Sequence, residues 1–82
     1  MEIKNILNQI ENECKIAAEQ YPEFHSAHEG YGVLTEEYRE LETEIFKRSS
    51  KRDLTLMRKE AIQVAAMAVR LIHDVIDKGN NI

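Results

Sequence analysis

The sequence contains few residues that interrupt a helix: one proline, Pro22, and three glycines stand among its 82 residues. This scarcity favours long helices over many turns. One cysteine, Cys14, excludes an intrachain disulfide, and a lone thiol fits a reducing compartment. A chain of this length is expected to form a single domain, residues 1–82, which buries too little surface to be more than marginally stable alone.

Long apolar runs are also missing. No stretch approaches the roughly 20 apolar residues of a membrane span, and the first residues, MEIKNILNQIENE, are too often charged for a signal peptide. We therefore expect no membrane partner and a cytoplasmic location. A formal net charge of −4 without a basic stripe argues against a nucleic-acid partner. With 43% hydrophobic residues, the chain is nevertheless too apolar to be disordered.

Helical periodicity dominates what remains, because apolar residues recur at steps of three and four in three segments. The first segment covers about residues 2–20 and stops before Pro22, which cannot continue a helix. Its apolar face consists of Ile3, Leu7, Ile10, Cys14, Ala17 and Tyr21.

The second segment carries its own apolar face, formed by Tyr31, Leu34, Tyr38, Leu41 and Ile45. Ser26 and Glu29 match the capping box S-x-x-E, which predicts a helix start at Ser26. Two glycines weaken the first turns, so a start at Thr35 is the alternative, and they would also permit a bend or a close backbone approach. We expect this helix to end near Arg48.

The third segment, about residues 53–78, is expected to begin at a cap formed by Ser50 or Asp53 and to end at Gly79. One face consists of Ala61, Val64, Ala65, Ala68, Leu71, Ile72 and Val75, and the far side holds Ile62, Ala66, Val69 and Ile76. Two helices of one short chain hardly cover such a helix. The predicted fold is therefore all-α: a three-helix protomer that assembles into a helical-bundle homo-oligomer, a dimer or a tetramer.

Five glutamates crowd the stretch LTEEYRELETE, residues 34–44. At about 100° per residue, Glu37 and Glu40 lie about 60° apart, on the flank of the apolar face. Glu60 and Gln63 stand in the same relation to the apolar face of the third helix. If the two helices pack antiparallel, both pairs face one cleft, where their oxygen atoms suit Mg²⁺ or Mn²⁺. The alternative is a solvated helix face, on which glutamates are common.

The motifs EEYRE, residues 36–40, and EAIQ, residues 60–63, resemble a known pattern. It is the E-E-x-x-E and E-x-x-D pattern of the all-α nucleoside triphosphate pyrophosphohydrolases, the MazG-like and dimeric dUTPase-like superfamily. The wider stretches SAHEGYGVLTEEYREL and RKEAIQVAAMAVRLI are similar to a small MazG-like subgroup found in phages and mobile elements of bacteria. The resemblance covers about residues 24–74.

The resemblance implies a dimeric or tetrameric helical bundle that hydrolyses a nucleoside triphosphate to the monophosphate and pyrophosphate. It implies a Mg²⁺ site formed by Glu37, Glu40, Glu60 and Gln63, with Glu36 orienting metal or water and Glu36 or Glu37 taking a proton from the attacking water. The family has aspartate where this chain has Gln63. An amide oxygen still ligates Mg²⁺ but brings no charge, which would weaken metal binding. This departure favours a second function, a non-catalytic helical oligomer that serves as an interaction or assembly module.

Several other side chains are candidates for substrate contacts. Those for phosphate binding are Lys47, Lys51, Arg58 and Lys59, with a solvated basic loop as the alternative. Phe24 or Tyr31 could stack on a base, although both suit a core or an interface. His25 and His28 lack further ligands at fixed spacing, so we interpret them as surface or interface residues. Cys14 lies on an apolar face and is expected in the core, not as a nucleophile.

Overall fold

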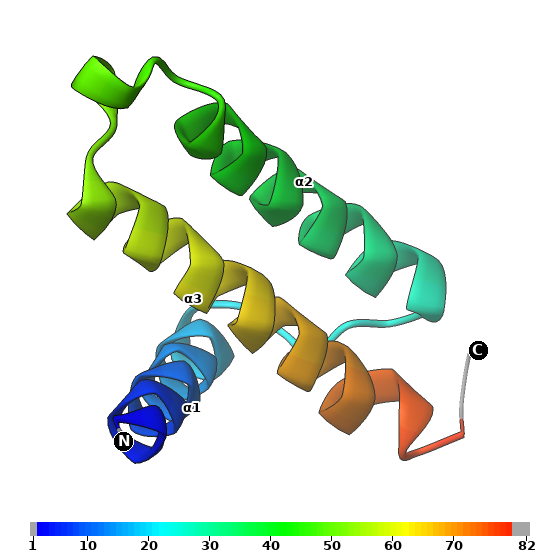
Figure 1. Ribbon diagram of the computed structural model, residues 1–82. Coiled ribbons are helices and arrows are strands. Elements are labelled where there is room, and N and C mark those ends of the chain that lie inside the picture. Colours follow the sequence, from blue (N-terminus) through cyan, green and yellow to red (C-terminus); the bar gives the residue numbers. More distant parts are fainter. Residues whose placement is uncertain (1, 80–82) are drawn as a thin grey trace.

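The computed structural model describes residues 2–79 and consists of three α-helices with short connections (Figure 1). Helix α1 spans Ile3–Gln20, α2 spans Ala27–Ile45 and α3 spans Leu54–Leu71. A 3-10 turn, η1 (Ser49–Lys51), lies between α2 and α3, and a π-helical turn, η2 (Ile72–Ile76), prolongs α3. Residues 2–79 contain no strand, so the predicted all-α fold class is confirmed.

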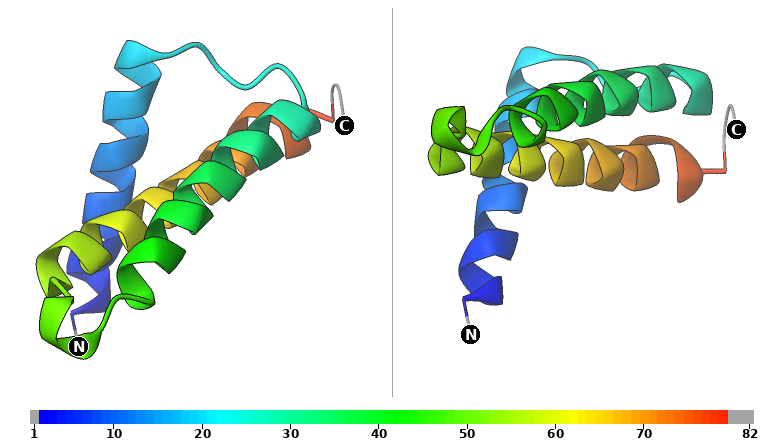
Figure 2. Two further views of the ribbon diagram at one scale, coloured as in Figure 1. Left: turned by 90° about the horizontal axis from the view of Figure 1, so that it is seen from above. Right: turned by 45° about the horizontal axis from the view of Figure 1, so that its top comes forward.

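Helices α2 and α3 lie side by side and run antiparallel, joined by the loop that carries η1 (Figure 1). Helix α1 packs on α3 and crosses it at a steep angle (Figure 2). Residues 2–9 are all exposed, so only the C-terminal half of α1 contributes to the interior. The two helices that carry the glutamate motifs, α2 and α3, are therefore neighbours, and α1 packs against α3.

Local sequence signals set the helix ends. At the start of α2, Ser26 Oγ accepts a hydrogen bond from the Glu29 backbone N–H at 3.1 Å, which confirms the predicted capping box. Asp53 Oδ1 caps α3 by accepting from the backbone N–H groups of two residues in its first turn. Gly79 adopts φ +68°, and its N–H donates to the Val75 carbonyl at 3.0 Å, which is the expected glycine C-cap.

The core is small and lies where α1, α2, α3 and the residue 21–26 linker meet. Its buried members are Ala17, Phe24, Ala66, Met67 and Val75. Gly30 contributes by its lack of a side chain, because a Cβ there would lie 2.6 Å from Leu71 Cδ1. The close backbone approach expected for this glycine pair therefore occurs at Gly30, between α2 and the end of α3.

The apolar faces predicted for α2 and α3 are only partly buried within one chain. Tyr31 and Tyr38 of α2 are 66% and 54% exposed, whereas Gly30 and Glu44 are buried. On α3 the buried residues include Ile62 and Ala66 of the predicted far side and Met67, which belongs to neither predicted face. The pattern identified apolar residues correctly, but it did not say which of them meet within one chain.

No helix within residues 2–79 combines the length and the apolar character needed to cross a bilayer.

Candidate metal centre

Three glutamates from the antiparallel pair α2 and α3 converge at one place. Glu37 and Glu40 come from α2, Glu60 comes from α3, and one carboxylate oxygen of each lies within 4.8 Å of the others. Residues at i and i+3 share a helix face, and the loop around η1 returns α3 alongside that face. Glu37 and Glu60 are half-buried and Glu40 is exposed, so the cluster opens to solvent on one side.

The closeness of these carboxylates changes their acidity. Burial raises the pKa of the Glu37 carboxyl, and the neighbouring charges of Glu40 and Glu60 raise it further. Burial also raises the pKa of Glu60, to which a hydrogen bond with Glu40 adds, while the Lys59 charge acts in the opposite direction. Glu37 and Glu60 therefore hold negative charge at a cost, which a proton or a cation would relieve.

The donor set suits a hard divalent cation. Carboxylate oxygens are the ligands that Mg²⁺ and Mn²⁺ prefer. Within residues 2–79, no lysine or arginine forms an ion pair with Glu37, Glu40 or Glu60. Glu44, one turn further along α2, differs because Lys47 Nζ pairs with it at 2.7 Å. The three clustered glutamates thus lie close together without a direct ion pair among the residues that the structure describes.

Gln63, the fourth residue of the predicted set, follows Glu60 by one turn but is held toward α1. Its Nε2 donates to Glu13 Oε2 at 2.8 Å. We did not single out Glu13 from the sequence. A signal was available, because Glu13 stands three residues after Ile10 and four before Ala17, on the face by which α1 packs.

A cavity of about 580 Å³ adjoins these residues, between α1, α2 and α3. Its acidic lining residues are Glu13, Glu29, Glu36 and Glu37, and its other walls include Gln63, Phe24 and Arg70. Glu36 is exposed and reaches this cavity, although it does not belong to the carboxylate cluster. The site is therefore a carboxylate cluster beside a hollow of the size that small ligands occupy.

The four basic residues predicted to bind phosphate do not gather in one place. Lys47 pairs with Glu44, and Lys51 is exposed in η1. Arg58 Nη1 donates to Gln9 Oε1 of α1. Together with Lys59, Arg58 lines a second hollow of about 470 Å³, which shares Glu13 with the first.

The remaining residues considered for substrate contacts or catalysis lie mostly in the core or at the surface. Phe24 is buried, with the Arg70 guanidinium 4.4 Å from its ring centre, and Tyr31 is exposed. His25 lies near the Glu29 carboxylate at the surface, and His28 is exposed. Cys14 is half-buried against the core, and burial raises the pKa of its thiol, which disfavours the nucleophilic thiolate.

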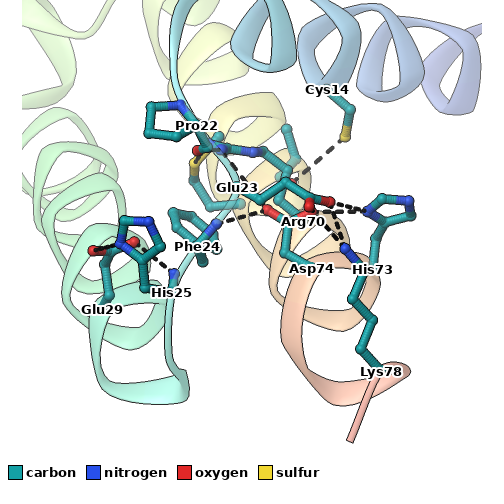
Figure 3. Close-up of polar contacts among 12 residues, drawn as sticks. Cys14, Pro22, Glu23, Phe24, His25, Glu29, Arg70, His73, Asp74 and Lys78 are labelled. Atoms are coloured by element: carbon teal, nitrogen blue, oxygen red, sulfur yellow. Dashed lines mark hydrogen bonds and ion pairs between the residues drawn. The ribbon is translucent and has the colours of Figure 1, made fainter. Parts of the chain in front are cut away.

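A buried polar cluster that the sequence did not reveal fixes the linker between α1 and α2 (Figure 3). Asp74 accepts from the Phe24 backbone N–H at 3.1 Å and contacts His73 Nδ1 at 2.8 Å. Arg70 Nη2 donates to the Pro22 carbonyl at 3.1 Å and lies 3.9 Å from Asp74 Oδ2. Although burial alone would raise it, these hydrogen bonds and the Arg70 charge lower the pKa of Asp74. The cluster therefore sets how α1 approaches α2 and α3.

Comparison with known proteins adds no identification: no family model, no curated protein and no solved structure matches this chain. The family resemblance of the two glutamate motifs therefore stays a proposal.

Glu40→Gln tests whether the three carboxylates repel one another. Raised pKa values mean that the folded chain binds protons more readily than the unfolded chain, so its stability falls as pH rises from the usual glutamate range through the raised values. At pH 7 with a chelator, the variant should gain about 0.5 kcal/mol, or about 2–4 °C in melting temperature. Thermal melts at pH 7 and near pH 4 check this, since the gain should shrink at the lower pH. An equal melting temperature at pH 7 would show that the repulsion is negligible.

Proposed function

We propose that this chain is a Mg²⁺-dependent nucleoside triphosphate pyrophosphohydrolase, which cleaves a nucleoside triphosphate to the monophosphate and pyrophosphate. The observation that carries the proposal is the convergence of Glu37, Glu40 and Glu60 from two antiparallel helices, with their oxygens within 4.8 Å. The resemblance of EEYRE and EAIQ to the MazG-like pattern supplies the reaction. The adjoining cavity of about 580 Å³ supplies room for a nucleotide.

In this proposal the glutamates have different roles. Mg²⁺ or Mn²⁺, when bound by Glu37, Glu40, Glu60 and the Gln63 amide oxygen, would neutralise charge on the phosphate oxygens. Glu36 lines the cavity and would hold the attacking water there. Glu36 or Glu37 would take the proton of that water.

The direct test is pyrophosphate release from a panel of canonical and modified nucleoside triphosphates, with Mg²⁺ and with Mn²⁺. Release from one nucleotide would establish the activity and its substrate together. If no nucleotide releases pyrophosphate and neither metal raises the melting temperature, the proposal is wrong.

A non-catalytic helical oligomer is the second candidate, and the exposed apolar residues of α2 favour it. Tyr31, Tyr38 and Ile45 recur every seventh residue along α2 and are exposed, and Phe46 follows at 80% exposure. Rows of this kind are more often covered by a partner than left in water. A homo-oligomer, dimer or tetramer, fits either function. Metal-dependent release of pyrophosphate therefore distinguishes the hydrolase from the non-catalytic oligomer.

Tyr38→Lys tests the oligomer. A lysine in the middle of this row places a charge where an apolar contact is proposed, so we expect dissociation to monomers at micromolar concentration. Sedimentation velocity measures the change directly. Thr43→Lys is the control, because Thr43 is exposed on the same helix but lies about 140° around from Tyr38. A parent chain that sediments as a monomer at high concentration would contradict the proposed assembly.

A further inference from the structure

The turn between α2 and α3 carries the two most exposed large apolar side chains of the residues that the structure describes. Phe46, which follows α2, is 80% exposed, and Leu54, the first residue of α3, is 76% exposed. Because α2 and α3 run antiparallel, both residues lie at the same end of the molecule, on either side of η1 (Figure 1). We call residues 46–54 the hairpin tip. The cavities of about 580 and 470 Å³ are lined by residues outside the hairpin tip.

The hairpin tip is basic, although the chain as a whole is acidic. It holds four basic residues and one acid, the capping residue of α3, in a chain with a formal net charge of −4. Lys47 pairs with Glu44. Within residues 2–79, no carboxylate forms an ion pair with Arg48, Lys51 or Arg52. The hairpin tip thus combines positive charge with exposed apolar side chains.

Hydrogen bonds hold the hairpin tip in a defined shape. Arg52 Nε donates to the carbonyl oxygens of Ile45 at 3.0 Å and of Lys47 at 3.1 Å. These bonds tie the segment after η1 to the end of α2, where helical carbonyls lack a partner within the helix. The Lys51 N–H donates to the Arg48 carbonyl at 2.7 Å within η1. A binding partner therefore meets a preformed turn, so that little conformational entropy is lost on binding.

This combination fits the surface of a bilayer that contains anionic lipids. Such a surface attracts lysine and arginine through the headgroup charge, and phenylalanine and leucine enter the boundary between headgroups and acyl chains. A single-stranded nucleic acid would attract the same bases, but it binds by stacking on rings. Leu54 has no ring, and Phe46 is the one aromatic residue of the hairpin tip. We expected no membrane partner because the sequence lacks a spanning segment, but a contact at the bilayer surface needs none.

The acidic residues of the two helices determine how the hairpin tip would approach a bilayer. Glu40 lies about 9 Å along α2 from Phe46, and Glu60 lies equally far along α3 from the start of that helix. Both distances exceed the Debye length of about 8 Å at physiological ionic strength. Glu42 is closer to Phe46, at about 6 Å, and would oppose binding in part. An end-on approach keeps most of the acidic charge away from the headgroups.

We propose that the hairpin tip docks on the surface of bilayers that contain anionic lipids. Phe46 and Leu54 insert at the interface, and the basic side chains of the hairpin tip contact the headgroups. Two apolar side chains and a few charges give reversible binding and not a permanent anchor. The contact uses neither the carboxylate cluster nor the cavity beside it, so it does not depend on the proposed hydrolase activity.

The first test reports insertion directly. The chain contains no tryptophan, so a single tryptophan in the hairpin tip reports its own surroundings. With phosphatidylcholine vesicles that contain phosphatidylserine, the emission of Phe46→Trp should move to shorter wavelength and be quenched by lipids brominated on their acyl chains. Tyr21→Trp is the control, because Tyr21 is also exposed but lines a cavity with Arg70, far along α3 from the hairpin tip. Its emission should not change.

The second test measures affinity by co-sedimentation of the full chain with the same vesicles. Lys51→Glu should weaken binding about 25-fold, because each of the two elementary charges that it changes contributes about fivefold near an anionic surface. Phe46→Ala should weaken binding about tenfold, because it removes one inserted ring. Lys15→Glu makes the same change of charge on α1, at another exposed lysine, and should have a much smaller effect.

Weaker binding of Lys51→Glu and Phe46→Ala, with melting temperatures equal to the parent's, supports the proposal, because both side chains are exposed and their loss should not affect folding. Equal binding to vesicles with and without phosphatidylserine would overturn it, and so would equal binding by the parent and both variants. Anionic vesicles that bind no protein, together with a single-stranded oligonucleotide that does, would assign the hairpin tip to nucleic acid and exclude the bilayer.

Discussion

Glu60→Gln should reduce pyrophosphate release at least about a hundredfold, because metal-based charge stabilisation supplies several kcal/mol to reactions of this type. The substitution keeps the shape of the side chain and removes one charge from the carboxylate cluster. Stabilisation of the folded chain by Mg²⁺ should be lost in parallel. For the parent, a metal concentration of 100 times Kd would stabilise the folded state by about 2.7 kcal/mol. Initial rates with the best nucleotide and melting curves with and without Mg²⁺ measure both effects.

Glu42→Gln is the matched control for this substitution. Glu42 is exposed on α2 and lies outside the cluster of Glu37, Glu40 and Glu60. It should therefore retain the parent's rate and its response to Mg²⁺. A Glu60→Gln variant that matches Glu42→Gln in both respects would mean that the cluster is a charged surface and that the proposed metal centre does not exist.

Asp74→Ala should destabilise the chain by about 3–5 kcal/mol, because it leaves the buried Arg70 without its carboxylate. It also removes the acceptor of the Phe24 backbone N–H. Since small domains are stable by only about 5–15 kcal/mol, this loss is a large share of the total. Urea unfolding at pH 7 measures it. Because the pKa of Asp74 is lowered in the fold, its contribution should persist above the usual aspartate pKa and disappear as pH falls through the lowered value.

Two further variants make this prediction specific. Asp77→Ala removes a carboxylate from an exposed position three residues further on and should change stability by less than about 0.5 kcal/mol. Combining Asp74→Ala with Arg70→Met should recover much of the loss, because an apolar side chain has no charge to leave unpaired. If Asp74→Ala and Asp77→Ala unfold at the same urea concentration, the Arg70–Asp74 pair contributes nothing to stability.

The features that the sequence predicted are those with local causes. Helix ends follow from Ser26, Asp53 and Gly79, whose side chains or backbone act within one turn. The convergence of Glu37 and Glu60 follows from helical phase and from a loop short enough to return α3 along α2. Both depend only on neighbouring segments of the chain.

The features that the sequence did not predict depend on how α1 is placed. Glu13 meets Gln63, and Asp74 meets Phe24, across about 50 residues of chain. The periodicity of apolar residues does not specify the angle at which one helix crosses another. A broad apolar face can pack against a neighbouring helix at several crossing angles. For the same reason the exposure of Tyr38 could not be foreseen. An arginine and an aspartate spaced i, i+4 in an apolar helix were the sole local hint of the buried cluster.

The steep crossing of α1 has a consequence for the order in which the chain folds. Contacts between α2 and α3 join consecutive segments through a short loop, whereas those of α1 with α3 close a loop that contains the whole of α2. Short-range contacts form faster than long-range ones, because they cost less chain entropy to close. The helical hairpin of α2 and α3 is therefore expected to form first, with Glu37, Glu40 and Glu60 already together. The cavity, and with it the Glu13–Gln63 bond, is completed only when α1 docks.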